Sequence, residues 1–574
     1  MKRSGLFVLP RLREIHVVLL LAALIGLLGA LVTVAFRIAI RHVEWVFTGH
    51  MSGLVEAAQS LVWWQRLTVP VIGGLVAGAI LQFGLRLVRG RPTTDYMEAV
   101  AVGDGVLGVR TSLVKSASSL VTIGSGGSIG REGSMVQLAA LVGSVTGRLL
   151  PHSESRMRLL VACGAAAGMA SAYNAPIAGA LFVAEIVLGS IAMESLGPML
   201  VSSVVASATV HNLLGYAPVF AIPPLRFVSP WETLFYFALG IVCGVAAPLF
   251  LFVLTEVEKG FASLALPLYG KMALGGLVVG VLSVDRPEIW GNGYSVVTQI
   301  IHARLAWQLV AVVLVLKVVA TAATAGSGAA GGVFTPTIFV GASLGFLLGS
   351  GVHAAFPGVT AGPDTYAVVG MGALLAATTH APVMSILMIF EMTLDYDIVL
   401  PLMLGCVTAY YVSRSHLNSE SIYARSLRSK AAERWAGRLE GLGVRDFVET
   451  EAPSVAAGAD LDALIDRMRT CREESVLVIA EPDTLVGVLA AESVATALAE
   501  HERPGDRRAA DLATRDHPFL TPDLSLGAAL QVFARSGAAW LPVIAGAEDR
   551  RLLGRVHKCA IFQALADDWQ RQRT

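Results

Sequence analysis

Gly124-Ser125-Gly126-Gly127-Ser128-Ile129-Gly130-Arg131-Glu132-Gly133-Ser134 is a glycine- and serine-rich stretch that lies between two apolar segments. A second stretch of the same kind, Gly326-Ser327-Gly328-Ala329-Ala330-Gly331-Gly332-Val333-Phe334-Thr335-Pro336, nearly repeats it. Aligned without a gap, six residues are identical: Gly124, Ser125, Gly126, Gly130, Ala140 and Gly143 fall on Gly326, Ser327, Gly328, Gly332, Ala342 and Gly345. Glycine lets backbone amides crowd together, and a following helix start leaves N–H groups without a partner. Each stretch is therefore suited to holding an anion.

Composition assigns the chain to the membrane. Hydrophobic residues make up 55% of it and charged residues only 15%, with a mean hydropathy of +0.66. A soluble chain carries about 25% charged residues. The formal net charge of +0 gives no indication of a nucleic-acid partner.

The cysteines indicate neither a disulfide framework nor a metal site. The five are scattered, without CxxC spacing, at Cys163, Cys243, Cys406, Cys471 and Cys559. We expect free thiols, and no cofactor is indicated.

The first apolar run, about residues 17–34, follows the basic residues Lys2, Arg3, Arg11 and Arg13. A cleavable signal peptide has a shorter apolar stretch and a small-residue cleavage site, so we expect a first membrane helix. The basic flank predicts a cytoplasmic N-terminus, in a cell (inner) membrane protein that crosses the bilayer several times.

Apolar segments of two lengths follow within residues 1–430. Long runs recur near 66–83, 231–254, 308–324 and 397–412, whereas 111–123 and 381–395 are too short or too Gly/Ser-broken for a simple span. Broken helices at membrane depth have to be buried in protein or line a polar cavity. This anatomy is typical of a transporter or channel.

A second repeat supports internal symmetry. Ala175-Pro176, Leu181 and Glu185 match Ala381-Pro382, Leu387 and Glu391. The two repeats together predict halves of about 12–215 and 230–425, and the repeats alone leave open whether these are parallel or inverted. In such proteins the binding site lies where corresponding broken helices meet.

The remainder of the chain reads as a soluble domain. A basic stretch from Arg414 to Arg434 follows the last apolar run. Two copies of one β–β–α unit come after it. Strands are predicted at 475–479 and 485–489 with a helix at 492–499, and again at 539–544 and 552–556 with a helix at 560–569.

Three motifs in order resemble the CLC family of chloride channels and chloride/proton exchangers. They are Gly130-Arg131-Glu132-Gly133, then Gly332-Val333-Phe334-Thr335-Pro336, then Tyr423 in Ser421-Ile422-Tyr423. The resemblance covers about 15–430, and Thr94-Asp95-Tyr96-Met97-Glu98-Ala99-Val100 further resembles its ClcB-type bacterial branch. The tail, with units at about 440–500 and 506–570, resembles a pair of CBS domains.

The resemblance implies a membrane all-α fold with inverted repeats and broken helices, a cytosolic α/β tandem CBS domain, and a homodimer. The two glycine-rich segments would open helices whose N-termini point at a chloride in the middle of the lipid bilayer. Such an ion loses hydration free energy of order tens of kcal/mol in an uncompensated low-dielectric medium. The partial charges of helix ends and amide donors attract the ion weakly enough to release it, whereas a full positive charge would hold it too tightly.

The predicted anion ligands come from both segments. We expect Gly130 and Arg131 in the first segment, and Gly332, Val333 and Phe334 in the second, to bind the anion. The donors are expected to be the amides of Val333, Phe334, Arg131 and Glu132. Pro336 suits a first helical turn, where its missing N–H costs nothing. Tyr423 would offer its hydroxyl to the anion. An interfacial tyrosine after the last membrane helix is the alternative for Tyr423.

Glu132 is the predicted gate. A carboxylate at a helix start can occupy the place of the anion, because it satisfies the same amides, and protonation or displacement would open the site. The resemblance assigns this role to the glutamate of the first motif. The alternative is a first-turn glutamate that complements the helix dipole, paired with Arg131.

The chain departs from the family pattern at three places near the predicted pathway. The family usually has a serine ligand earlier in the chain, and Pro92 falls on that position, so only Thr93 in a shifted register supplies a hydroxyl. Ser134 replaces the proline that commonly follows the first motif. Ile186 stands where exchangers often carry a second glutamate, and an isoleucine cannot relay a proton. Its neighbour Glu185, like Glu391, is expected to be structural, through buried pairing or helix capping.

The tail lacks the family's nucleotide contacts. Nucleotide-binding CBS units often have Thr or Ser three residues after the strand glycine and Asp six after it. After Gly487 these places hold Ala490 and Ser493, and after Gly554 they hold His557 and Ala560. We expect a dimerisation or regulatory module with no strong nucleotide site, and His557 at its surface.

Three functions compete. The first is passive, voltage- or pH-dependent chloride conduction, and the second is chloride/proton antiport by the same fold. A CBS-containing divalent-cation transporter is the third, and it would need clustered membrane carboxylates, whereas Glu132, Glu185 and Glu391 are dispersed. No nucleophile–base pair or metal spacing indicates an enzyme.

Overall fold

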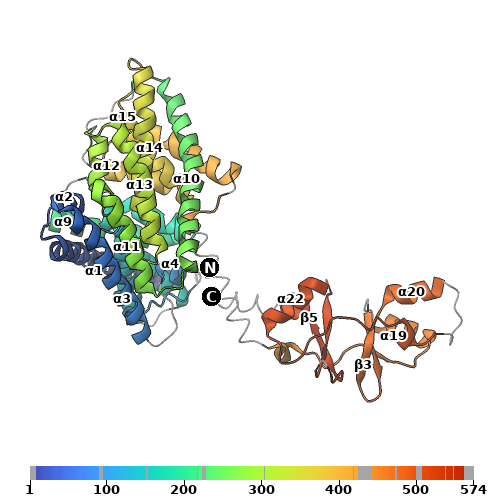
Figure 1. Cartoon of the computed structure of the whole chain (residues 1–574). Coiled ribbons are helices and arrows are strands. Elements are labelled where there is room, and N and C mark those ends of the chain that lie inside the picture. Colours follow the sequence, from blue (N-terminus) through green and yellow to red (C-terminus); the bar gives the residue numbers. More distant parts are fainter. Residues whose placement is uncertain are drawn as a thin grey trace, which may run out of the picture. The chain divides into compact units, whose positions relative to one another are not determined.

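The chain folds as two compact units, Met1–Arg428 and Ser429–Thr574. Each is described by itself from a computed structural model (Figure 1). The structure describes residues 8–88, 95–101, 103–149, 153–215, 218–220, 222, 228–302, 304–417, 419–423, 443–471, 475–499, 507–536, 538–546 and 548–561.

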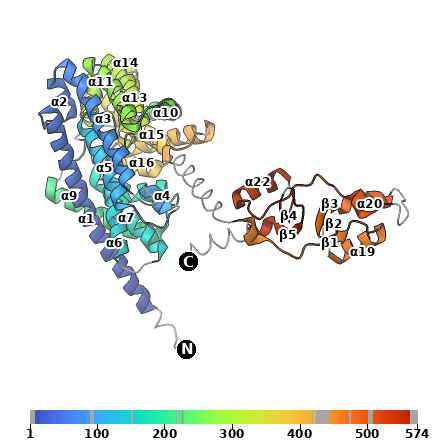
Figure 2. The same ribbon diagram turned by 60° about the horizontal axis from the view of Figure 1, so that its bottom comes forward.

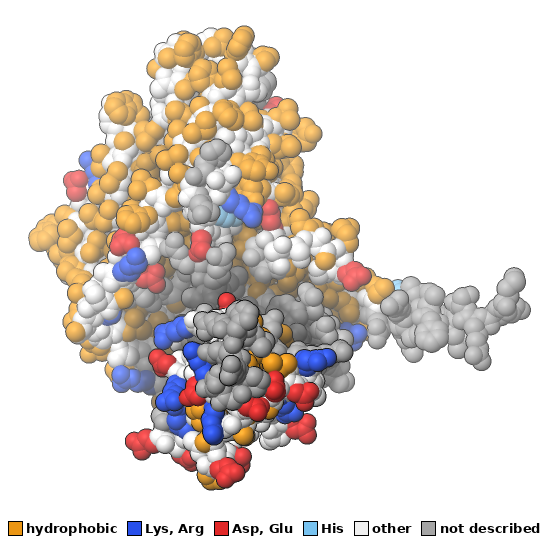
Figure 3. All heavy atoms as spheres, turned by 90° about the vertical axis from the view of Figure 1, so that its right-hand side faces the viewer, with side chains coloured by type: hydrophobic (Ala, Val, Ile, Leu, Met, Phe, Trp, Pro, Cys, Tyr) orange, Lys and Arg blue, Asp and Glu red, His pale blue; other side chains and the backbone are white. Residues whose placement is uncertain are grey.

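The first unit is helical and apolar on the outside. Within the described residues, 7 helices are long and apolar enough to cross a membrane. They are α1 (Val8–Thr48), α3 (Trp63–Leu87), α9 (Met193–Leu214), α10 (Glu232–Ser263), α11 (Leu268–Asp285), α13 (Trp307–Gly326) and α14 (Phe334–Ala355). Orange hydrophobic side chains dominate the face of this unit in Figure 3, whereas charged ones crowd the second unit. The protein is therefore a multi-pass membrane protein.

Ten further α-helices are described in this unit. They are α2 (Leu54–Ser60), α4 (Tyr96–Ala101), α5 (Val109–Gly124), α6 (Glu132–Arg148), α7 (Glu154–Tyr173), α8 (Pro176–Leu181), α12 (Tyr294–Ile301), α15 (Pro363–Thr379), α16 (Pro382–Thr393) and α17 (Val399–Tyr411). A π-helical turn, Phe182–Val187, continues α8. The segments expected to be too short for a span are α5, with 16 residues, and α16, with 12.

Pairs of helices bury small residues against one another. Helix α11 packs on α3, α14 on α15 and α6 on α7, and Figure 2 shows α3 and α5 running side by side. A Cβ on Gly341 would overlap the carbonyl of Gly370, so the contact between α14 and α15 depends on glycine. This close approach suits helices in lipid, where association depends on packing.

Corresponding positions of the two glycine-rich stretches share one backbone conformation. Gly126 has φ +91 and Gly328 has φ +96, a region that residues with a Cβ avoid. Asn174 and His380, which end α7 and α15, also match, with φ 54 and φ 59. The sequence repeat is thus also a repeat of structure.

The first membrane helix is longer than the predicted run of 17–34. Helix α1 has 41 residues, because the helix continues past the apolar run through Arg37 and Arg41 to Thr48. Its charged end forms part of a cavity described below.

The second unit holds two similar halves. The first is built from β1 (Ser454–Ala456), α19 (Leu461–Cys471), β2 (Ser475–Ala480), β3 (Thr484–Ala490) and α20 (Ala491–Ala499), and α21 (Ala509–Leu512) packs on its apolar cluster. The second is built from α22 (Leu526–Ser536), β4 (Trp540–Ile544) and β5 (Leu552–His557), and η4 (Val444–Phe447), although earlier in the chain, packs on the apolar cluster of this half. Strand β1 pairs parallel with β2, and β2–β3 and β4–β5 are antiparallel hairpins that shift register at matching places, Val478/Ile479 and Val543/Ile544. Both predicted strand pairs are present, and each is preceded by a helix that the prediction lacked.

The halves of the tail share an apolar cluster that includes Leu477, Leu485, Trp540 and Ile544. The helix predicted at 560–569 lies mostly outside the described residues. All five cysteines are free thiols, as expected.

Candidate functional site

The candidate site is built from the starts of α6 and α14. Neither helix has a side chain that caps its N-terminus: Arg131 precedes α6 with helical backbone angles, and Val333 precedes α14. Pro336 is the third residue of α14, where no intrahelical N–H is needed. Both helix starts therefore leave first-turn amides to be satisfied by another partner.

The two glycine-rich stretches meet directly. Gly130 and Gly332 form an antiparallel bridge, in which the Gly130 amide donates to the Gly332 carbonyl at 2.7 Å and the Gly332 amide donates back at 3.0 Å. A Cβ on either glycine would strike the carboxylate of Glu132. The absence of side chains at these positions makes room for that carboxylate.

Glu132 reaches from one helix start to the other. Its side chain is buried, with 3% exposure. Carboxylate Oε1 accepts the Thr335 amide at 3.1 Å, and Oε2 accepts the Thr335 hydroxyl at 2.9 Å. The carboxylate thus occupies a position against Gly130, Gly332 and the first turn of α14. We call this position the carboxylate seat.

Aromatic rings surround the seat. The Tyr173 hydroxyl lies 3.0 Å from the Thr335 hydroxyl, and its ring is 5.2 Å from that of Phe334. Phe182 contacts Phe334 and Tyr423 edge-on, with centroids 6.3 and 6.0 Å apart. These rings place apolar surface beside the carboxylate, and the lower local dielectric strengthens its hydrogen bonds.

A cavity of about 410 Å³ borders Glu132 on one side. Its wall includes Tyr96, Tyr423, Gln137, Gly332 and Val333, and we call it the tyrosine cavity. Gln137 is fixed in that wall, because its Oε1 accepts the Tyr96 amide at 3.0 Å and its Nε2 donates to the Ser112 hydroxyl at 3.0 Å.

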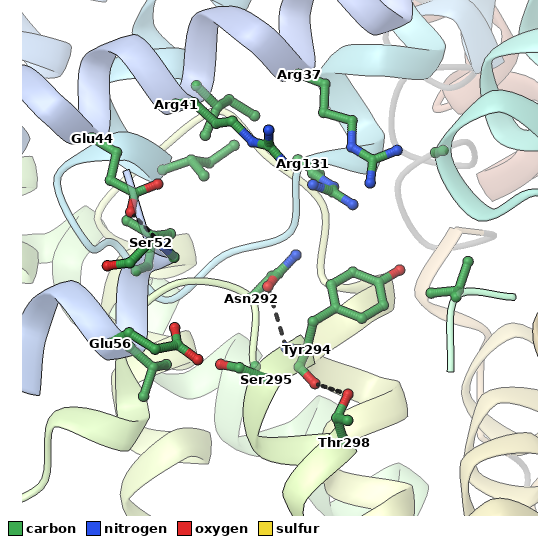
Figure 4. Close-up of a pocket in the computed structure, with 18 of the residues that line it drawn as sticks. Arg37, Arg41, Glu44, Ser52, Glu56, Arg131, Asn292, Tyr294, Ser295 and Thr298 are labelled. Atoms are coloured by element: carbon green, nitrogen blue, oxygen red, sulfur yellow. Dashed lines mark hydrogen bonds between the residues drawn. The ribbon is translucent and has the colours of Figure 1, made fainter. Parts of the chain in front are cut away.

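A second cavity, of about 480 Å³, lies beside Arg131. Figure 4 shows Arg37, Arg41 and Arg131 across the top of the view, with Glu44 beside Arg41 and Glu56 below it. We call it the arginine cavity. It shares no lining residue with the tyrosine cavity, although the neighbours Arg131 and Glu132 each line one of them. The carboxylate seat therefore lies between two separate water-accessible spaces.

The predicted anion ligands lie around the seat except for Thr93. The amides of Gly130 and Gly332 donate to each other's carbonyls, and the Glu132 amide interacts with its own carboxylate. Within the described residues, the amides of Arg131, Val333 and Phe334 donate no hydrogen bond to the protein, so they are available to an anion. Tyr423 lies in the wall of the tyrosine cavity. Thr93 and its alternative Pro92 lie outside the described residues. The ligand roles stay predictions.

Arg131 does not pair with Glu132. Its guanidinium lies 5.4 Å from the centre of the Tyr294 ring, on the side of the arginine cavity. The alternative in which Glu132 is held by Arg131 has no support from this geometry, whereas the contacts with Thr335 match a carboxylate that takes the place of an anion.

Sequence reasoning missed five residues around the site. Thr335 belongs to the second motif, but nothing in the sequence predicts its contact with Glu132. Tyr96 lies inside the Thr94–Val100 stretch and Tyr173 lies just before the Ala175-Pro176 repeat, but neither tyrosine carries a signal of its own. Arg37 and Arg41 were missed as well, although their spacing by four residues at the end of an apolar helix puts both on one face.

Glu185 and Glu391 are structural, as expected, and the role is helix capping. The Glu391 carboxylate accepts the amides of Ile177 and Ala178 at 3.0 and 2.8 Å. The Glu185 carboxylate accepts the amide of Met384 at 2.8 Å. Ile186, next to Glu185 in the π-helical turn, packs against the apolar core.

In the tail, His557 ends β5 and lies 3.7 Å from Glu449, which also contacts Arg555 at 3.3 Å. A histidine engaged by a neighbouring carboxylate has an ordinary structural role. No group of three His, Cys, Asp or Glu side chains that could hold a metal occurs among the described residues.

Comparison with known proteins matches these features. Residues 73–414 match the family described as voltage gated chloride channel, and residues 509–567 match the CBS domain. The chain is 58% identical over 413 residues to a putative chloride channel protein ClcB-like of Ralstonia nicotianae, covering 71% of this chain and 96% of that one. It is 45% identical over 419 residues to the voltage-gated ClC-type chloride channel ClcB of Salmonella typhimurium, covering 72% and 99%.

Solved structures share the fold. A slow cyanobacterial Cl-/H+ antiporter superposes with a TM-score of 0.65 at 24% identity, covering 72% of this chain and 98% of that one. A CLC-type fluoride/proton antiporter gives a TM-score of 0.59 at 22% identity, covering 73% and 98%. A eukaryotic CLC transporter gives 0.58 at 17% identity and covers 95% of this chain and 98% of that one.

Proposed function

Because the chain belongs to the voltage-gated chloride channel (CLC) family, we propose that it conducts chloride passively through the carboxylate seat, with Glu132 as the gate. The observation that carries this proposal is the position of the Glu132 carboxylate. It is bound by the amide and hydroxyl of Thr335 between two cavities that share no lining residue. A chloride that displaces it would meet donors already arranged for an anion.

Gating follows from competition for these donors. When the carboxylate is ionised it satisfies Thr335 and closes the passage between the cavities. A protonated carboxyl group is neutral and competes less well with chloride for donors at a helix start. We therefore propose that acidification or a high chloride concentration opens the pathway. Tyr423 and the amides of Arg131, Val333 and Phe334 hold the passing ion.

Passive conduction is favoured over exchange by the residues on the cytoplasmic side. Ile186 cannot carry a proton, and its neighbour Glu185 is engaged by the Met384 amide. The second candidate is chloride/proton antiport. It is favoured by the hydroxyl chain from Glu132 through Thr335 to Tyr173, with steps of 2.9 and 3.0 Å, and by the antiporters among the structures of similar fold.

The membrane arrangement is also part of the proposal. The basic N-terminal flank supports a cytoplasmic N-terminus and tail in the cell membrane. The arginine cavity, at the C-terminal end of α1, then opens to the opposite face. Family membership supports a homodimer in which each subunit has its own pathway and each half, about 12–215 and 230–425, has inverted topology. The tail at about 440–570 serves as a pair of CBS units.

One experiment separates the two functions. Purified protein in liposomes is given a chloride gradient, and chloride efflux and internal pH are recorded together. Passive conduction predicts chloride efflux with no proton uptake beyond that of empty liposomes. Proton movement in fixed proportion to chloride, against its own gradient, would establish antiport instead. Liposomes without chloride efflux would refute both.

A further inference from the structure

The arginine cavity has a basic wall without a counter-charge in contact with it. Arg37 and Arg41 come from the end of α1, and Arg131 comes from the loop before α6 (Figure 4). Within the part of the chain that the structure describes, none of the three forms an ion pair or a side-chain hydrogen bond. An arginine guanidinium is always charged and offers five N–H donors. Three such groups that face one cavity create a positive potential inside it.

Of the two carboxylates of the cavity, Glu44 lies about one turn beyond Arg41 in α1 and within range of its charge, but forms no ion pair with it. Glu44 is buried and turned to the backbone, since its Oε1 accepts the Gly53 amide at 2.9 Å. Glu56, in α2, lies beside it (Figure 4). The charged lining therefore consists of three arginines and two glutamates, and this excess of positive charge lets the cavity take an anion.

Neutral donors add to the basic half. Trp290 lines the cavity, is fully buried, and has an indole N–H without a partner among the described residues. The Tyr294 ring holds the Arg131 guanidinium at 5.4 Å. A space of about 480 Å³ is far larger than one chloride needs, so it admits a small anion that keeps part of its hydration shell.

We propose that the arginine cavity is a second anion site, distinct from the carboxylate seat, which binds small inorganic anions and supplies them to the seat from one side of the membrane. The two sites have different chemistry. Guanidinium groups bind the anion in the cavity, whereas the seat offers backbone amides and hydroxyls. This inference rests on the proposed function only in taking the seat as the next step of the pathway.

The proposal predicts a side-dependent defect. In planar bilayers with chloride varied separately on each side, the double variant Arg37→Gln/Arg41→Gln should raise the half-saturating chloride concentration for entry from the arginine-cavity side by about three- to tenfold. Entry from the other side should be unchanged, and an impermeant salt such as sodium gluconate should reduce the difference by screening.

Three further variants complete the test. Arg37→Lys/Arg41→Lys keeps both charges and should restore most of the affinity. Glu56→Gln should lower the half-saturating concentration. Arg304→Gln, an exposed arginine that does not line the cavity, is the matched control and should have no effect. Equal changes from both sides, or none in the double variant, would overturn the proposal.

A binding measurement decides the question without transport. The thermal unfolding midpoint of detergent-purified protein should rise more in sodium chloride than in sodium gluconate at equal ionic strength, because a ligand of the folded state stabilises it. The double variant should lose part of this chloride-specific rise, and an undiminished rise would refute the second site. If wild-type protein carries no chloride at all, the proposed function fails while this comparison still tests the cavity.

Discussion

Glu185 and Glu391 each cap a helix that belongs to the other copy of the repeat. Glu391, in α16, binds the first amides of α8, and Glu185, in the turn that continues α8, binds an amide in the first turn of α16. The exchange is reciprocal between segments that lie 199 to 214 residues apart in the chain. It explains why both acids occur at matched positions of the repeat: each satisfies amides that would otherwise be buried without a partner.

We expect Glu391→Ala to destabilise the membrane unit more than Glu185→Ala. Glu391 accepts two amides, at 3.0 and 2.8 Å, whereas Glu185 accepts one at 2.8 Å and interacts more weakly with the Val383 amide. Each buried donor left without a partner costs about 1–3 kcal/mol. Thermal unfolding in detergent measures the loss. The two substitutions should be nearly additive, since they expose different helix starts, and Glu→Gln at either position should cost less. A larger effect at Glu185 would contradict the capping roles.

Replacing Glu132 with Gln should leave the fold intact and abolish the pH dependence of chloride flux, because the titrating competitor for the seat is gone. Wild-type flux should rise as pH falls. Flux from liposomes at several pH values measures this. Glu232→Gln is a matched control, since Glu232 is also fully buried and accepts backbone amides but lines neither cavity. An unchanged pH profile in Glu132→Gln would remove Glu132 as the gate.

Thr335→Val should raise chloride flux near neutral pH. It removes the hydroxyl that binds Glu132 at 2.9 Å, and a hydrogen bond to a charged group contributes about 1.5–3 kcal/mol. The equilibrium ratio of closed to open protein should then fall about tenfold or more. Thr335→Ser keeps the hydroxyl and serves as the control. Equal flux in the Val and Ser variants would show that this contact does not hold the gate.

Lys317→Met should destabilise the wall of the arginine cavity. Lys317 is fully buried in α13, and its ammonium donates to the carbonyls of Ile289 and Gly291 at 2.7 and 2.6 Å. These carbonyls lie next to Asn292 and Tyr294, which line the cavity. A loss of about 2–5 kcal/mol is expected from two orphaned carbonyls. Lys271→Met, at an exposed lysine that bonds one carbonyl, is the control, and equal melting temperatures would contradict the role of Lys317.

Nucleotides should bind the tail weakly. Neither copy has an acidic residue at the ribose position, where Ser493 and Ala560 stand. Titration of ATP or AMP into the full-length protein by calorimetry checks this, and micromolar binding would contradict it.

Removing the residues beyond about 440 should leave a folded membrane unit, because the two units are separately compact.

The sequence predicted the glycine-rich helix starts because their chemistry is local. Gly126 and Gly328 need positive φ, and Pro336 fits a first turn, so pattern and structure agree there. The short helices α5 and α16 could be foreseen from the length of their apolar runs. The sequence indicates helix capping as one of two roles for Glu185 and Glu391, because a repeated acid in an apolar segment needs a polar partner.

Contacts between distant segments could not be predicted from the sequence. Thr335 binds Glu132 across more than two hundred residues, and no property of a threonine in a first turn distinguishes that contact from an ordinary cap. Arg37 and Arg41 meet Arg131 only because α1 continues beyond its apolar run. The length of that helix depends on packing against its neighbours, which periodicity does not report.

The bridge between Gly130 and Gly332 has a consequence for how this protein can vary between species. Gly130 and Gly332 pair with each other and both lie against the Glu132 carboxylate, so neither copy of the repeated segment can change independently at this point. A side chain acquired at Gly130 would have to be accommodated by the opposite strand as well as by Glu132. Sequence differences between the two copies are therefore expected mainly in the outward-facing helices. Gly130 and Gly332 should change only together.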